Sequence, residues 1–305
     1  MLTCRSASRV SMNRAGARMM LLVPLILAAV LCGGPLWCSD EQGALRQPSL
    51  DVPYEPSSYG IAEEMLRMAD TTSRDLVYDL GCGDGRIVIM AAKERGARGI
   101  GVDIDPERIK ESRENAEAAG VGHLVRFFEH NLFFTDIRRA TVVMIYLYPD
   151  VNLKLRPRLL TDLKPGSRIV SSTYTMEEWE PDATQRVEGH DLYFFVVPAN
   201  VTGTWHWVNR NRQRTSLHLA QKFQSVQGSI TFGKQTYPIT NCSLRGDALR
   251  FSVERRVQGN NETLFFEGRI SGNTIEGSIM QGKTGRAKSR WKAMREGKTR
   301  VSIAE

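Results

Sequence analysis

Short apolar segments alternate with stretches of helical length between residues 75 and 197, and this alternation constrains the fold more than any other feature. The expected strands are 76–80, 99–102, 125–128, 141–147, 168–173, 185–188 and 192–197, and the expected helices are 61–69, 85–95, 106–119 and 153–163. The pattern predicts an α/β domain with a Rossmann-like, doubly wound sheet of seven strands. Ligands of such sheets bind at the carboxyl ends of the strands.

The charge of the chain is distributed over three unlike regions. The chain has 305 residues and a formal net charge of +7, and its 41% hydrophobic and 25% charged residues exclude disordered, collagen-like, coiled-coil and multi-span membrane proteins. Residues 1–39 carry +4, residues 40–199 carry −8 and residues 200–305 carry +11. We therefore expect a leader followed by two domains, with these boundaries.

The leader has the parts of a secretory signal or of an N-terminal membrane anchor. Four arginines and no acid precede an apolar run over residues 19–32, which small and turn-forming residues follow. The run is shorter than the roughly 20 residues of a membrane span. We expect export or membrane anchoring, with an organelle transit peptide as the alternative.

Cysteines and histidines give no evidence of a metal site or a disulfide framework. Only Cys82 and Cys242 lie outside the leader, and neither has a nearby histidine in the sequence. His123, His130 and His190 are isolated in the sequence. We expect each of them to be a surface or hydrogen-bonded residue, and we expect no metal ligand.

A glycine-rich loop joins the first expected strand to the following helix. Residues 77–85 read VYDLGCGDG, and the loop glycines are Gly81, Gly83 and Gly85. Glycines at alternate positions permit a tight turn and close approach of a ligand. Two acids sharpen the pattern, because Asp79 precedes the glycines and Asp103 follows the second strand. An acid at that strand end is placed to accept hydrogen bonds from ribose hydroxyls.

These residues resemble the class I S-adenosylmethionine-dependent methyltransferases. Residues 79–85 match the first motif of the family, and Asp103 matches its ribose-binding acid. The third-strand motif reads FFEHNL at residues 127–132, with Asn131 where the family commonly has an aspartate beside adenine. The amide of Asn131 can still form one hydrogen bond with an amino group.

The likeness extends to the seven-strand protein lysine methyltransferases of archaea and mitochondria, and covers about residues 51–182. It rests on VPYEPSS at 52–58, on IYLYP at 145–149, and on LRP and LKPGSRIVS at 155–157 and 163–171. The cofactor-binding residues that it implies are Tyr54, Asp79, Gly81, Cys82, Gly83, Gly85, Asp103, Ile104 and Asn131. The implied residues beside the methyl group and the substrate lysine are Tyr146, Tyr148 and Pro149.

If the resemblance holds, the protein aligns the cofactor and desolvates the nucleophile for an in-line methyl transfer. A lysine amine must lose its proton first, and an apolar aromatic environment favours the neutral form. We assign no general base. The alternative for Tyr146 and Tyr148 is that both are aromatic strand residues that pack under a helix.

The pattern changes after Pro198 to short alternating strands with turn residues between them. The eight expected strands are 203–208, 216–223, 228–232, 237–244, 248–255, 263–270, 274–280 and 289–295. They predict an all-β meander or an eight-strand, lipocalin-like barrel. Its charge of +11 suits an anionic ligand or a membrane surface, or belongs to a solvated structural domain. The basic residues are spread over many strands, which argues against nucleic acid.

The sequence leaves three functions open. The first is an S-adenosylmethionine-dependent methyltransferase that N-methylates lysine side chains of protein. The second is an exported binding protein with an inactive methyltransferase-like domain, and the third is a small-molecule methyltransferase. The intact set of acids and glycines favours an active enzyme. Export conflicts with this interpretation, because S-adenosylmethionine is made in the cytosol.

Overall fold

The computed structural model describes residues 55–208, 212–257, 259–282, 287–297 and 303. The expected leader, residues 1–39, and Tyr54 lie outside these ranges. Among the described residues, no helix combines the length and the apolar character that crossing a bilayer requires.

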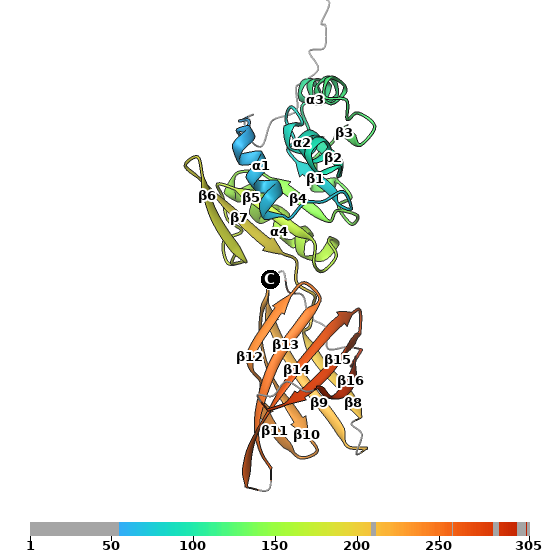
Figure 1. Cartoon of the computed structure of the whole chain (residues 1–305), viewed down its shortest axis with the longest axis vertical. Helices are drawn as coiled ribbons and strands as arrows, with labels where there is room; N and C mark the ends of the chain where they lie inside the picture. Colours follow the sequence, from blue (N-terminus) through green and yellow to red (C-terminus); the bar gives the residue numbers. More distant parts are fainter. Residues whose placement is uncertain (1–54, 209–211, 258, 283–286, 298–302, 304–305) are drawn as a thin grey trace, which may run out of the picture. The chain divides into compact units, whose positions relative to one another are not determined.

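The first sheet has seven strands in the order β3-β2-β1-β4-β5-β7-β6 (Figure 1). Its strands are β1 (Leu76–Leu80), β2 (Arg98–Asp103), β3 (Val125–Glu129), β4 (Val142–Ile145), β5 (Arg168–Ser172), β6 (Ala183–Val187) and β7 (His190–Val196). The first five are parallel, whereas β7 runs antiparallel to β5 and β6 runs antiparallel to β7. The prediction of a Rossmann-like sheet of seven strands is confirmed.

Helices cover both faces of this sheet. They are α1 (Tyr59–Met68), α2 (Arg86–Arg95), α3 (Pro106–Ala118) and α4 (Pro149–Asp162), with a short 3₁₀ helix, η1 (Leu132–Phe134). The first three pack against one face, and α4 packs against the other. Successive side chains of β1 point to opposite faces of the sheet and so enter two separate cores. Val77 packs in the first core, with α1, α2 and α3, and Tyr78 packs in the second core, with α4. The order of strands reverses between β1 and β4, where such sheets bind ligands (Figure 1).

The fourth helix begins earlier than the sequence indicated. We expected a helix over 153–163, but α4 starts at Pro149 and contains Pro157. A proline suits the first helical turn, where no backbone N–H partner is lost. Four buried side chains anchor α4 to the sheet despite the internal proline, namely Val151, Leu155, Leu159 and Leu160.

A buried ion pair joins the starts of β1 and β5. Asp75 pairs with Arg168 and accepts hydrogen bonds from Thr72 N and Thr141 Oγ1, each at 2.8 Å. Burial raises the pKa of the Asp75 carboxyl, but these hydrogen bonds and the charge of Arg168 together lower it below its usual range. The network therefore stabilises the folded state while Asp75 is ionised.

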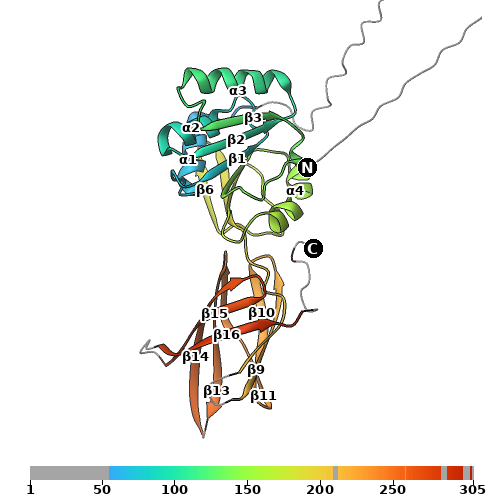
Figure 2. The same cartoon turned by 90° about the vertical axis from the view of Figure 1, so that its right-hand side faces the viewer.

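The second sheet has nine described strands in the order β11-β10-β9-β8-β16-β15-β14-β13-β12 (Figure 1, and turned by 90° in Figure 2). They are β8 (Gly203–Val208), β9 (Arg214–Lys222), β10 (Ser225–Phe232), β11 (Gln235–Pro238), β12 (Thr240–Arg245), β13 (Ala248–Val257), β14 (Asn260–Ser271), β15 (Thr274–Gln281) and β16 (Ala287–Arg295). All neighbouring pairs are antiparallel, as a meander requires. Trp205, Phe251, Phe266 and Trp291 are buried in its core.

The prediction of an eight-strand barrel was wrong, because this sheet is not closed. The segment expected as one strand, residues 237–244, contains the break between β11 and β12, and these pair with β10 and β13 at opposite edges. Pro238 has no backbone N–H for a ladder, and Asn241 has a φ of 50°. The chain therefore changes partners near Ile239 instead of continuing one strand.

Candidate active site

The loop between β1 and α2 has the backbone geometry that its glycines predicted. The three glycines have positive φ angles, at Gly81 (92°), Gly83 (52°) and Gly85 (81°). A Cβ on Gly85 would lie 2.7 Å from the Phe127 ring, so a side chain there would meet both strain and overlap. The Val102 carbonyl accepts hydrogen bonds from the N–H groups of Gly81 (2.8 Å) and Cys82 (3.0 Å). The loop is thus held against the end of β2.

Asp103, the last residue of β2, connects the glycine loop to the next turn. Its Oδ2 accepts a hydrogen bond from Gly83 N at 2.9 Å, and its Oδ1 accepts one from Asp105 N at 3.0 Å. Each carboxylate oxygen has further acceptor capacity. Asp105 in turn caps α3, because its side chain accepts from Glu107 N. The two expected acids and the glycines therefore meet at one edge of the sheet.

A pocket that is partly open to solvent lies at this edge. It brings together nine of the predicted residues, namely Asp79, Gly81, Cys82, Gly83, Asp103, Ile104, Asn131, Tyr146 and Tyr148. Two predicted residues do not line it. Gly85 is the N-cap of α2, and Pro149 is the first residue of α4. Their place is structural, at the starts of two helices that border the pocket.

The pocket also contains residues that the sequence patterns did not indicate. Among them are Glu55, Ser57, Arg86, Arg108, His130, Leu132 and Tyr174. Glu55 stands next to Tyr54 in the loop that carried the family resemblance, which was a usable signal. Tyr174 follows β5 by two residues, and a carboxyl-end position could have suggested it. His130, expected to be hydrogen-bonded, has its Nδ1 2.9 Å from Asn131 O.

The electrostatics of the pocket suit a ligand that carries positive charge. Asp79 is 3% exposed and forms no ion pair with any described residue. Burial raises the pKa of its carboxyl well above the usual range, and the Asp103 and Asp84 carboxylates add to this effect. A bound cation would offset the charge. S-adenosylmethionine combines ribose hydroxyls with cationic groups, so the acids and the open glycine loop fit it.

Cys82 contributes shape to the pocket and not reactivity. Burial raises the pKa of its thiol well above the ordinary range, and the nearby Asp79 and Asp103 carboxylates raise it further. The side chain is 5% exposed and packs with the first core. A neutral, buried thiol is a weak nucleophile.

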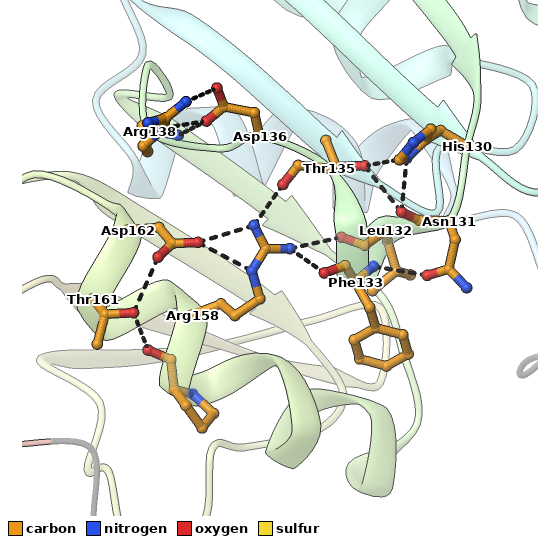
Figure 3. A network of polar contacts seen from close by, with 11 residues as sticks. His130, Asn131, Leu132, Phe133, Thr135, Asp136, Arg138, Arg158, Thr161 and Asp162 are labelled. Atoms are coloured by element: carbon orange, nitrogen blue, oxygen red, sulfur yellow. Dashed lines mark hydrogen bonds and ion pairs between the residues drawn. The ribbon is translucent and has the colours of Figure 1, made fainter.

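Polar contacts fix the segment that follows β3 (Figure 3). Asn131 caps η1, because its Oδ1 accepts from Phe133 N at 2.9 Å. Arg158 of α4 donates to the carbonyls of Phe133 and Thr135 and pairs with Asp162. The side-chain oxygen of Asn131 is thus used internally. Its amide N–H groups remain the donors that this side chain has for a ligand.

Aromatic side chains form the other end of the pocket. The ring of Tyr148 contacts that of Tyr174 edge to face, with centroids 6.0 Å apart. The ring of Tyr146 meets His190 in the same way at 6.3 Å. Tyr146 and Tyr148 both line the pocket, and Tyr148 remains 36% exposed. Their role beside the methyl group stays a prediction.

Comparison with known proteins places this site among methyltransferases. Residues 79–183 match the family described as the ANTKMT methyltransferase domain. A protein-lysine N-methyltransferase from Saccharolobus islandicus is 41% identical over 151 residues, which are 48% of this chain and 94% of that protein. An adenine nucleotide translocase lysine N-methyltransferase from Mus musculus is 31% identical over 160 residues, which are 50% of this chain and 69% of the relative.

A solved structure is similar over about the same share of the chain. An RNA methyltransferase from Salinibacter ruber, in complex with S-adenosyl-L-homocysteine, is 47% identical, with a TM-score of 0.48. The match covers 48% of this chain and 96% of that chain. About half of the present chain thus has these relatives.

Proposed function

The chain belongs to the S-adenosylmethionine-dependent protein-lysine N-methyltransferases, and on this premise we propose that it methylates the ε-amino group of lysine in a protein substrate. S-adenosylmethionine is its cofactor. The observation that carries the proposal is the composition of the pocket. A glycine loop and Asp103 occupy one end, and three tyrosines with one carboxylate occupy the other.

The loop end is proposed to hold the cofactor. Asp103 offers acceptor positions to the ribose hydroxyls, while the N–H groups of Asn131 face an adenine edge. Asp79 lies within the pocket as a counter-charge for a cationic group. When bound, S-adenosylmethionine supplies an electrophilic methyl group on a sulfonium centre.

The aromatic end is proposed to receive the lysine side chain. Tyr146, Tyr148 and Tyr174 can contact the methylene groups of lysine and exclude water around its nitrogen. A poorly solvated amine favours the neutral, nucleophilic form. Holding that nitrogen in line with the methyl group is the main catalytic task of the protein, because alignment alone can lower the barrier substantially.

Labelled cofactor tests the proposal directly. The full chain is incubated with methyl-labelled S-adenosylmethionine and a cell extract, and the protein fraction is hydrolysed to amino acids. We expect label in methyllysine, and the labelled protein band identifies the substrate. Label found only in small molecules or in nucleic acid would refute the assignment to protein lysine.

The cellular location is a separate proposal. The arginine-rich leader favours export or membrane anchoring, with the catalytic domain then dependent on a supply of cofactor. Fractionation of cells together with N-terminal sequencing of the mature protein tests this. An intact leader in the soluble cytosolic fraction would contradict it.

The basic β domain is proposed to bind an anionic membrane surface. Residues 200–305 carry a net +11, although several cations pair with acids across neighbouring strands, as in Arg250–Glu267, Arg269–Asp247 and Lys292–Glu276. Co-sedimentation with vesicles of neutral or acidic lipid tests the idea. Equal binding to both, or none to either, would oppose it.

A further inference from the structure

Two pocket carboxylates, Asp79 and Glu55, form no ion pair with a described residue, and we assign Asp79 to the cofactor. Asp84 pairs with Arg86, and Arg108 pairs with Glu111. Asp103 holds backbone N–H groups, and Asp105 caps α3. Glu55, by contrast, forms no ion pair with any described residue, and its side chain lines the aromatic end of the pocket.

A line of neighbouring side chains leads from Glu55 to His190, the first residue of β7. Burial is the main cause of the raised pKa of the Tyr146 hydroxyl, and Glu55 raises that pKa further whereas Thr173 lowers it. Thr173 Oγ1 lies 3.0 Å from His190 Nδ1. An ionised carboxylate only accepts, so a hydrogen bond between Glu55 and Tyr146 takes the Tyr146 hydroxyl proton and leaves its oxygen to accept from Thr173. In that arrangement the single hydroxyl proton of Thr173 is used, and His190 donates from Nδ1.

The backbone at Thr173 is strained in a way that supports this arrangement. Its φ is 68°, in the left-handed region, where a β-branched residue is an outlier. The Thr173 N–H donates to Asp191 O at 2.7 Å, which holds the strained residue against β7. Strain of this kind gathers where a side chain must be aimed at a site. Here it directs Oγ1 between Tyr146 and His190.

We propose that Glu55 binds the ammonium group of the substrate lysine as it enters the pocket, before the amine loses its proton, and that Thr173 and His190 position Glu55 through the Tyr146 hydroxyl. The inference rests on the proposed function and deepens it, because it names the residue that selects a cationic side chain. Tyr148 and Tyr174 line the same pocket, where they can contact the methylene groups that lysine and norleucine share. An uncharged side chain of the same length as lysine has no terminal charge with which Glu55 could pair.

Binding of a short glycine–serine peptide with one central lysine tests the proposal without turnover. The peptide is titrated into the full chain in the presence of S-adenosylhomocysteine, beside a second peptide with norleucine in place of lysine. We expect the wild type to prefer lysine about 10- to 100-fold, the range for a charge-assisted hydrogen bond. Glu55→Gln should bind both peptides equally, with unchanged affinity for S-adenosylhomocysteine.

A matched control removes the same charge elsewhere. Glu114 is exposed on α3 and does not line the pocket, so Glu114→Gln should keep the preference for lysine. Thr173→Ser keeps the hydroxyl and should also retain it, whereas Thr173→Val should weaken lysine binding. Equal loss in the serine and valine variants would reduce Thr173 to a structural role and contradict its part in the proposal.

The two levels of the hypothesis fail in different ways. If the wild type yields labelled methyllysine but Glu55→Gln still prefers the lysine peptide, the assignment of Glu55 is refuted and the proposed function stands. If the wild type binds S-adenosylhomocysteine but yields no methyllysine from any protein in the extract, the proposed function is refuted, and the role of Glu55 with it.

Discussion

Replacement of Asp103 by alanine should nearly abolish cofactor binding while leaving the fold intact. The carboxylate holds the loop through Gly83 N at 2.9 Å and the next turn through Asp105 N at 3.0 Å. It is also the acceptor that we assign to the two ribose hydroxyls. A hydrogen bond to a charged group contributes about 1.5–3 kcal/mol, so loss of two ribose contacts costs at least about 3 kcal/mol.

That free energy corresponds to a rise in Kd of about 100-fold, since each 1.4 kcal/mol is tenfold. Isothermal titration of the full chain with S-adenosylmethionine measures it. Asp103→Asn keeps the shape and one acceptor and should lose about tenfold. Asp136→Ala, which removes an exposed carboxylate paired with Arg138, is the control and should bind normally.

Thermal unfolding without ligand completes the test of Asp103. The side chain is half-buried, so we expect a loss of only about 1–3 kcal/mol in the free energy of unfolding. An Asp103→Ala variant that is folded and binds S-adenosylmethionine within about threefold of the wild type would refute the ribose assignment. A variant that is unfolded at the temperature of the titration would show instead that the loop contacts dominate.

Three further outcomes follow from the structure. Gly85→Ala should lose about 2–4 kcal/mol in the free energy of unfolding in urea, because its φ is positive and its Cβ would overlap with Phe127. Gly120→Ala, which has a positive φ but open space around it, should lose only about 1–2 kcal/mol. Equal losses in the two variants would exclude the overlap. Because the pKa of Asp75 is lowered in the folded state, its contribution to stability is complete above about pH 4 and is lost as the pH falls below that. The urea midpoint of Asp75→Asn should therefore depend less on pH than that of the wild type. Parallel curves of urea midpoint against pH for the two proteins would contradict this. Tyr146→Phe should lower kcat/KM for protein methylation about tenfold without changing cofactor affinity, because only the hydroxyl group and its polar interactions are lost. An unchanged kcat/KM would exclude Tyr146 from the catalytic site.

The local pattern predicted the architecture of the first domain well because its elements are locally determined. Strand–helix alternation gave seven strands, and the glycines gave the turn that precedes α2. The prediction failed where pairing depends on distant partners. In the second sheet, one expected strand divides at Ile239 between β10 and β13, and no local signal states which edge each half joins.

The sequence by itself determined the cofactor end of the site. The glycine loop and Asp103 lie within a short span of the chain, and consecutive parallel strands place their carboxyl ends at the same edge. Glycine spacing and acid position therefore specified both the local backbone and the kind of ligand.

Only the tertiary structure decided the acceptor end. Glu55, Tyr146, Thr173 and His190 come from four separate segments. They precede α1, follow β4, follow β5 and begin β7, and they meet only once these elements are packed together. The left-handed backbone at Thr173, whose N–H donates to Asp191 O, likewise has no counterpart in residue preference. Local chemistry thus fixes which ligand the glycine loop can bind, and long-range packing fixes which side chains line the other end of the pocket.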